Sequence, residues 1–180
     1  EFEEACYMHL APTSSTTALL VLGDALALVV SRAKNYTKEN FGRNHPAGAL
    51  GKKLLVKVSD LMHTGDANAL VPEGSSLRSA IVEMSAKGLS MVTIVDEAGK
   101  LKGIITDGDL RRMLMKHPNI EEVKAKDIMT KSPKTIEKND LVVNALELMR
   151  QKSITQLPVM ENGNYVGMIH IHDIIKEGII

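Results

Sequence analysis

One pattern of residues occurs twice in this chain of 180 residues. The sequence Val-Ser-Asp-Leu-Met at 58–62 returns as Ala-Lys-Asp-Ile-Met at 125–129, and a turn-rich stretch follows each copy. Farther along, residues 75–84 align with residues 140–149, so that an Ala and a Met fall at matching places. A repeat constrains the fold more than any local pattern does, because two copies of one sequence form two copies of one structural unit.

Each copy is predicted to run from a strand or turn through a helix and two strands to a second helix. A capping-type residue, Ser75 or Asp140, precedes apolar residues at helical spacing. A second helix is expected to open at Asp109 in the first unit and at Asp173 in the second.

Two short β-rich runs lie between these helices, at residues 91–95 and 101–106 in the first unit and at residues 156–160 and 165–170 in the second. The turns between the runs contain Asp, Glu, Asn and Gly, which predicts a β-hairpin in each unit. The sequence therefore predicts an α/β fold in which each unit packs its apolar helix face against its own small sheet.

Composition narrows the expected partners. Aromatic residues make up 3% of the chain, so stacking platforms for nucleic-acid bases are not expected. The 22 Lys and Arg residues balance 22 Asp and Glu residues, which gives no field to hold a polyphosphate or an anionic membrane. The single Cys6 excludes an internal disulfide and favours a cytoplasmic protein. We expect a small molecule or another copy of the chain as partner, and no cofactor or metal.

The most apolar stretch, residues 18–30, includes Gly23 and Asp24. It is shorter than the roughly 20 apolar residues that a membrane span needs, so a buried helix is predicted. The acidic opening of the chain does not resemble a signal peptide.

The doubled pattern resembles a tandem pair of CBS modules, the Bateman arrangement. The resemblance rests on Gly-Ile-Ile-Thr-Asp-Gly-Asp at 103–109 and Gly-Met-Ile-His-Ile-His-Asp at 167–173. It implies two CBS units, at 56–120 and 121–180, packed about a pseudo-twofold axis. It also implies an adenine or sugar nucleotide in the cleft between them.

The chemistry of the motif fits such a ligand. A Gly in the strand lets a ligand approach the backbone, a hydroxyl at a helix start suits a phosphate, and an Asp can bridge ribose hydroxyls. Carried over by position, the nucleotide contacts are Thr106 and Asp109 in the first unit and His170 and Asp173 in the second. His170 stands where the family usually has Ser or Thr.

Other roles for these residues remain open at this point. Asp109 and Asp173 can simply cap their helices, because Asp is among the preferred N-cap residues. His170 and His172 can lie on one side of a strand, but the sequence shows no third ligand nearby, so His63 and His172 are interpreted as turn or surface residues and not as metal ligands.

The first 55 residues have a different character. Five residues, Thr-Ser-Ser-Thr-Thr at 13–17, place hydroxyls at the start of the apolar helix, where they form an anion site or cap the helix. Farther on, His45 is followed by Pro and small residues at 46–51.

These segments and the Glu-Ala-Cys at 4–6 resemble the end of the sugar isomerase (SIS) domain of D-arabinose 5-phosphate isomerases, in which a CBS pair follows the SIS domain. Residues 1–55 would then be the C-terminal remnant of that domain, and the chain a C-terminal fragment. The family interconverts D-ribulose 5-phosphate and D-arabinose 5-phosphate for the octulosonate sugar of lipopolysaccharide. The resemblance further implies a homo-oligomer, a tetramer in the parent enzyme.

Moving a carbonyl between two carbons requires a base and a group that handles the hydroxyl protons. By resemblance, Glu4 and His45 are the catalytic residues, and Ser14, Ser15 and Thr16 bind the sugar phosphate. Otherwise Glu4 is a charged residue in a frayed terminus and His45 is a loop residue that orders the linker.

Two other functions stay open. One is a free-standing nucleotide-sensing CBS pair whose N-terminal helix serves assembly. The other is a related SIS–CBS isomerase of capsule or sugar-alcohol metabolism. In either isomerase reading, the fragment alone is expected to be inactive, because the upstream phosphate loop lies outside it.

Overall fold

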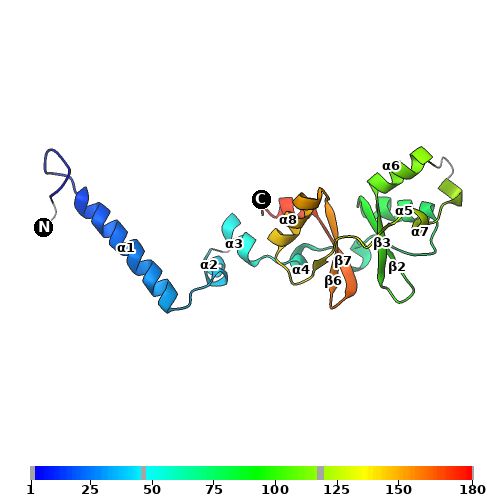
Figure 1. Ribbon diagram of the computed structural model, residues 1–180, viewed down its shortest axis with the longest axis horizontal. Helices are drawn as coiled ribbons and strands as arrows, with labels where there is room; N and C mark the ends of the chain where they lie inside the picture. The colour runs from blue at the N-terminus through cyan, green and yellow to red at the C-terminus, as the bar shows by residue number, and fades with distance from the viewer. Residues whose placement is uncertain (1–2, 46–47, 117–119, 180) are drawn as a thin grey trace.

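Two small sheets organise the second part of the chain, and a long helix leads into it (Figure 1). The computed structural model describes residues 3–45, 48–116 and 120–179. One sheet belongs to each repeat unit, which confirms the predicted α/β fold.

The first unit is built around a four-stranded sheet in the order β1-β2-β3-β4. Its elements are β1 (Leu70–Pro72), α5 (Leu77–Lys87), β2 (Met91–Val95), β3 (Leu101–Thr106), α6 (Asp107–Lys116) and β4 (Thr130–Lys131). Strand β1 is parallel to β2, and β2 is antiparallel to β3. The predicted hairpin is therefore confirmed.

The second unit repeats this plan. Its elements are β5 (Ile136–Glu137), α8 (Val142–Lys152), β6 (Gln156–Glu161), β7 (Asn164–His170) and α9 (Ile171–Lys176). Strand β5 is parallel to β6, and β6 is antiparallel to β7. The two hairpins even share a register shift at matching places, between Ile94 and Val95 and between Val159 and Met160.

Helices α5 and α8 are equivalent, as the repeat predicts. Each has 11 residues and buries the same three positions, which are Leu77, Ala80 and Met84 in α5 and Val142, Ala145 and Met149 in α8. Both begin one residue later than predicted. Ser76 caps α5 by accepting a hydrogen bond from the Ser79 N–H (3.1 Å).

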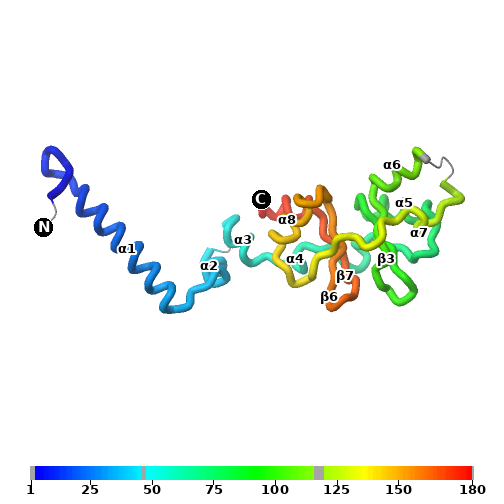
Figure 2. Tube along the Cα trace, in the orientation of Figure 1, coloured from blue at the N-terminus to red at the C-terminus, as the bar shows by residue number. Residues whose placement is uncertain are grey.

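The two units exchange short helices. Helix α4 (Val58–Leu61) belongs to the first unit in sequence, yet Val58 belongs to the core of the second unit. Helix α7 (Ala125–Ile128) belongs to the second unit in sequence, yet Ala125 belongs to the core of the first. Figure 2 shows the chain crossing between the units after residue 120. The predicted boundary near residue 120 divides the sequence into its two repeats. In space, each unit also contains one short helix from the other repeat.

The repeated Asp of the two short motifs explains why these helices form. Asp60 accepts a hydrogen bond from the Lys57 N–H (2.9 Å), and Asp127 accepts one from the Lys124 N–H (3.0 Å). Each carboxylate therefore satisfies a backbone donor at a helix start, where negative charge is also favourable.

Gly103 in β3 and Gly167 in β7 make room for the segments that cross between the two units. A Cβ at Gly103 would lie 2.7 Å from the carbonyl oxygen of Thr130, and one at Gly167 would overlap the carbonyl oxygen of His63. The prediction that these glycines open the backbone to a ligand was wrong, because the crossing segments, the stretches that contain His63 and Thr130, occupy that space.

The N-terminal part consists of α1 (Ser14–Ala33), α2 (Lys38–Asn44) and α3 (Ala49–Leu55), and two short 3-10 helices lie farther along, at Gly65–Ala67 and Ile120–Glu122. Helix α1 extends away from both units and has no buried residue (Figure 1). The expected burial was wrong for the described residues, none of which buries an apolar side chain of α1. Within the described residues, α1 is the one helix whose length and apolar composition would suffice to cross a membrane.

We expect Gly167→Ala to lower the free energy of unfolding by about 1–3 kcal/mol, because the added methyl group meets backbone that cannot move aside. Gly74→Ala is the matched control, since a Cβ there meets nothing within 4 Å. Its effect should stay below about 0.5 kcal/mol. Urea unfolding of both variants measures the difference, and equal stabilities would contradict the role assigned to the crossing segment.

Candidate ligand-binding sites

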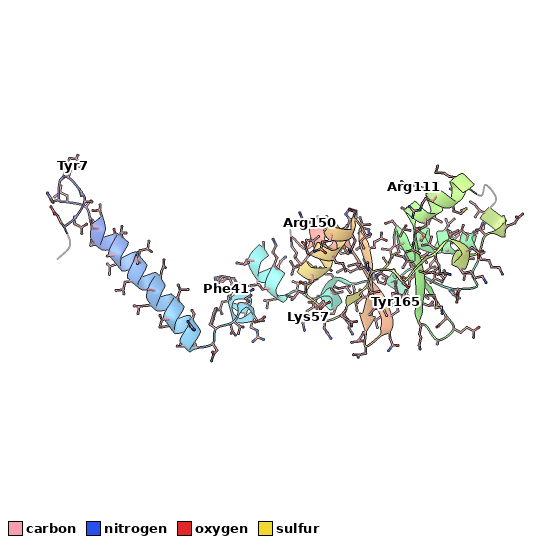
Figure 3. All side chains as sticks on the ribbon, viewed as in Figure 1. Tyr7, Phe41, Lys57, Arg111, Arg150 and Tyr165 are labelled. Atoms are coloured by element: carbon pink, nitrogen blue, oxygen red, sulfur yellow. The ribbon has the colours of Figure 1, made fainter. Side chains whose placement is uncertain are left out.

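Polar contacts join the two units where they face each other. The Tyr165 hydroxyl donates to Asn68 Oδ1 (2.7 Å) and lies 2.9 Å from Thr93 Oγ1. Burial raises the pKa of Tyr165, so the phenol stays protonated and can donate. Figure 3 shows Tyr165 between the units. These contacts link strand β7 of the second unit to the first unit.

The first cavity, here called the hydroxyl cavity, has a volume of about 520 Å³. Both units line it. Its lysines are Lys134 and Lys152, and its hydroxyl groups come from Ser90, Thr106, Thr130, Ser132, Ser153 and Thr155. Met91, Ile104 and Ile154 supply apolar wall. Two lysines against the single carboxylate of Asp107 favour an anion.

Thr106 and Asp109 form a reciprocal cap at the start of α6. The Thr106 N–H and hydroxyl both donate to Asp109 Oδ2, at 2.9 and 2.7 Å. The other carboxylate oxygen accepts from Arg112 (2.6 Å) and from the Thr130 hydroxyl (3.3 Å). This cap starts the helix two residues before the predicted position.

The carboxylate of Asp109 is thus committed to the protein. Burial raises its pKa, but the hydrogen bonds from Thr106 and Arg112 outweigh burial and leave the pKa below its usual value. Asp109 is 7% exposed, and it is not among the residues that line the two cavities between the units. The helix-capping role is therefore present in this structure, and a direct contact with ribose stays a prediction.

The second cavity, here called the histidine cavity, has a volume of about 540 Å³. His63 comes from the start of the first unit in sequence, whereas His170, His172 and Asp173 come from the end of the second. Lys87 and Asp107 also line it. One lysine against two carboxylates gives this cavity the opposite charge balance to the hydroxyl cavity.

His170 caps α9 as Thr106 caps α6, but it does so with a ring nitrogen. Its Nδ1 accepts a hydrogen bond from the His172 N–H (3.0 Å). Burial lowers the pKa of His170, and the charge of His172 lowers it further. The two rings stack with centroids 4.8 Å apart.

Asp173 has a partner across the units. Its Oδ2 lies 2.8 Å from Nε2 of His63. The repeat aligns His63 with Thr130 and Asp173 with Asp109, so this pair corresponds to the contact between Thr130 and Asp109 in the other half. As the side chains stand, no three His, Cys, Asp or Glu residues of the described part are arranged to hold a metal ion.

The structure divides three of the four predicted nucleotide residues between the two cavities, and Asp109 lines neither of them. Thr106 lines the hydroxyl cavity, and His170 and Asp173 line the histidine cavity. Sequence reasoning missed Lys134, Lys152 and the location of His63. The repeat contained a signal for His63, because it aligns this residue with a position next to the β3 strand of the other half.

Glu4 lies at the start of α1, next to the run of hydroxyl residues. Its Oε2 accepts hydrogen bonds from the Thr13 N–H (2.5 Å), the Thr13 hydroxyl (3.0 Å) and the Ser15 N–H (3.4 Å). Contacts with Ser15 and Thr13 lower the pKa of Glu4 to about 2. The predicted anion site thus holds the chain's own carboxylate, while Ser14 and Thr16 occupy the same first turn of α1.

His45 ends α2 and is exposed to solvent, with its ring 4.8 Å from that of Phe41. Gly51 in α3 fixes the backbone here, because a Cβ at this position would overlap the carbonyl oxygen of His45. Helix α1, about 30 Å long for its 20 residues, separates Glu4 from His45. A single copy of the described chain does not bring the two predicted catalytic residues together (Figure 1).

Helix α3 connects His45 to the second unit. Lys52 Nζ lies 2.9 Å from Glu177 Oε1 and donates to the Glu177 carbonyl oxygen at 2.8 Å. Just after α3, the Val56 carbonyl accepts from the Val142 N–H (2.9 Å). The segment from α3 to Val56 is therefore attached to the start of α8 and to the end of the second unit.

The chain is similar over nearly its whole length to curated isomerases. It is 43% identical over 178 residues to the arabinose 5-phosphate isomerase KdsD of Yersinia pestis, covering 99% of this chain and 54% of that protein. It is 45% identical over 179 residues to the KdsD of Pseudomonas aeruginosa, covering 99% and 55%. The chain spans about half the length of the curated relatives it matches.

Solved structures resemble the paired units. A CBS-domain containing protein from Agrobacterium tumefaciens superposes with a TM-score of 0.60 at 24% identity, over 67% of this chain and 98% of that one. The CBSX2 structure in complex with AMP superposes with a TM-score of 0.59 at 22% identity, over 69% of this chain and 96% of that one. The CBS pair of MJ0100, in complex with 5′-methylthioadenosine and S-adenosyl-L-methionine, gives 0.60 at 25%, over 68% and 94%.

A family model agrees with the repeat and with the two sheets. The model described as CBS domain matches residues 58–116 and 125–179, one match in each unit. The chain therefore belongs to the CBS domain family and contains a tandem pair of CBS domains.

Proposed function

We propose that this chain is the C-terminal part of a cytoplasmic isomerase that interconverts D-ribulose 5-phosphate and D-arabinose 5-phosphate, and that its CBS pair regulates the enzyme. The observation that carries the proposal is the reach of the similarity. Identity of 43–45% to arabinose 5-phosphate isomerases covers 99% of the chain and so includes the 55 residues before the CBS pair. A free-standing CBS pair would not need these residues.

The regulatory ligand is a phosphorylated nucleoside in the hydroxyl cavity. Lys134 and Lys152 offer charge for phosphate, and the Thr106 and Thr155 hydroxyls offer partners for phosphate or ribose. The apolar wall that contains Ile154 receives the base. The AMP complex of a structural neighbour supports the choice of an adenine nucleotide.

Asp109 contributes to this site through α6. Its carboxylate holds Thr106 and Arg112 in place and so fixes the start of the helix beside the cavity. A variant at Asp109 therefore changes the shape of the site even without a direct contact to the ligand.

Regulation reaches His45 through the second unit. Ligand contacts at Lys152 and Ser153 act on the end of α8, while the chain next to α3 is bonded to the start of the same helix. A shift of α8 therefore moves α3 and the adjacent His45. Couplings of this kind are typically worth about 1–3 kcal/mol.

Assembly supplies the missing cover of α1. Leu19, Leu20 and Leu28 are at least 67% exposed in the described chain. Apolar side chains at this density require a partner surface, which the rest of an SIS domain and further copies of the enzyme provide. A homo-tetramer of the full-length enzyme is the proposed assembly, and within it Glu4 and His45 act on a sugar phosphate held by Ser14, Ser15 and Thr16.

Calorimetry of the chain with AMP, ATP and a cytidine sugar nucleotide tests the regulatory site. The variants Lys134→Gln and Lys152→Gln should each weaken binding by about 10-fold, because each removes a charged hydrogen bond to phosphate. The affinity for adenosine, which lacks phosphate, should fall much less in these two variants. Lys100→Gln, in the β2–β3 turn away from the cavity, should leave affinity unchanged. The absence of binding by all three nucleotides would contradict the proposal.

Turnover of ribulose 5-phosphate tests the catalytic part. In the full-length enzyme, His45→Ala should lower the rate by about 10²–10⁴-fold, which is the usual contribution of a positioned proton-transfer group. The 180-residue chain alone should show no turnover. His9→Ala, which removes another histidine of the N-terminal part, is the control and should leave the rate unchanged. A full-length His45→Ala enzyme with unchanged turnover would rule out the assigned role.

A further inference from the structure

Thr13 ties the segment before α1 to the start of that helix. It is the N-cap residue of α1, yet its hydroxyl makes no capping hydrogen bond to a backbone N–H of the helix. The hydroxyl instead accepts the N–H of Ala5 (2.8 Å) and donates to Oε2 of Glu4 (3.0 Å). An N-cap threonine usually bonds to its own helix and stabilises it. The side chain of Thr13 is therefore used for a different contact, and its acceptor is the predicted catalytic carboxylate.

We propose that Thr13 is the positioning residue of Glu4 in the isomerase reaction, and that its hydroxyl holds the carboxylate where the substrate is bound. The inference rests on the proposed function, in which Glu4 and His45 act on a sugar phosphate. Thr13 acts through Glu4 and takes no part in the proton transfer itself.

Thr13 binds Glu4 twice, through its backbone and through its side chain. Oε2 of Glu4 accepts the Thr13 N–H (2.5 Å) as well as the hydroxyl, and the Ser15 N–H donates to the same oxygen at 3.4 Å. Two donors on one residue restrict the carboxylate more than a single hydrogen bond does. Glu4 is also half-buried, so water competes less for these bonds. Because the bonds end on Oε2, we assign the proton transfer to the other oxygen, Oε1.

The contact also brings the base next to the substrate-binding residues. Glu4 and Thr13 are nine positions apart in the sequence, and their hydrogen bonds close the segment between them onto the helix. Ser14, Ser15 and Thr16, which are proposed to hold the sugar phosphate, form the first turn of that helix. Thr13 thus lies in the chain directly before the phosphate-binding residues and fixes the base beside them.

The position of the base matters for the chemistry. As the base, Glu4 takes the proton from C2 of the aldose and returns it to C1, while a second group moves the hydroxyl protons. The carbonyl passes from C1 to C2, and no atom is gained or lost. Hydrogen bonds from Ser15 and Thr13 lower the pKa of Glu4 to about 2, so the carboxylate is ionised at neutral pH and can accept the proton. A misplacement of about 1 Å can cost about 10²-fold in rate.

Steady-state kinetics of the full-length isomerase test the proposal. Thr13→Val removes the hydroxyl but keeps the shape of the side chain and the backbone N–H. We expect kcat to fall by about 10- to 100-fold while KM changes by less than about twofold, because the substrate still binds but the base is poorly placed. Thr13→Ser returns the hydroxyl and should recover most of kcat. Ser31→Ala removes a hydroxyl near the other end of α1, and this control should leave both constants unchanged.

An isotope effect separates positioning from folding. With arabinose 5-phosphate deuterated at C2, a poorly placed base makes C–H cleavage a larger part of the overall barrier. The isotope effect on kcat should therefore be larger for Thr13→Val than for the parent enzyme. A variant that only folded less well would lower the active fraction and leave the isotope effect unchanged, and that result overturns the proposal.

Glu4→Gln tests the proposed function separately. Loss of turnover in Glu4→Gln, together with a parent-like kcat in Thr13→Val, overturns the positioning role alone. Full turnover by Glu4→Gln contradicts the catalytic role of Glu4 and with it the proposed function of this segment. A fall in kcat that Thr13→Ser does not recover also overturns the role of the hydroxyl.

Discussion

The exchange of short helices between the two CBS domains is the constraint on which the rest of the structure depends. Val58, from the first repeat, packs in the core of the second unit, and Ala125, from the second repeat, packs in the core of the first. Because each core needs both halves of the chain, the units form a single cooperative body. The same crossing segments place His63 and Thr130 beside the helices of the opposite unit, so the exchange that builds the cores also builds the cavities.

Two differences within the repeat, His170 for Thr106 and His63 for Thr130, supply two imidazoles of the histidine cavity. Thr106 caps α6 with a hydroxyl and binds Asp109, whereas His170 caps α9 with a ring nitrogen and leaves Asp173 to His63. A backbone N–H at the helix start has a side-chain acceptor in both cases, so the two helices begin in the same way. The side chains offered to a ligand change from mainly hydroxyls and lysines to imidazoles and carboxylates, although Ser90 and Asp107 line both cavities.

The repeat predicted the fold, the hairpins and the equivalence of α5 and α8, because local patterns of apolar and turn residues determine these elements. It did not predict which unit each short helix joins, since a residue at 58 carries no mark of its contact with residues near 140. The same limit hid the partner of Asp173, which lies 110 residues away at His63. The burial of α1 was predicted from its composition alone, although burial depends on a partner surface that the described chain does not contain.

The contact between Lys52 and Glu177 brings the entrance and the exit of the CBS pair to one point, across 125 residues of chain. A module whose two ends meet can be inserted after a catalytic domain without extending its reach or separating the parts on either side. A change of shape inside the pair would reach α3 through this contact and through the hydrogen bond between Val142 and Val56. Helix α3 is thus the element that links the CBS pair to the N-terminal part.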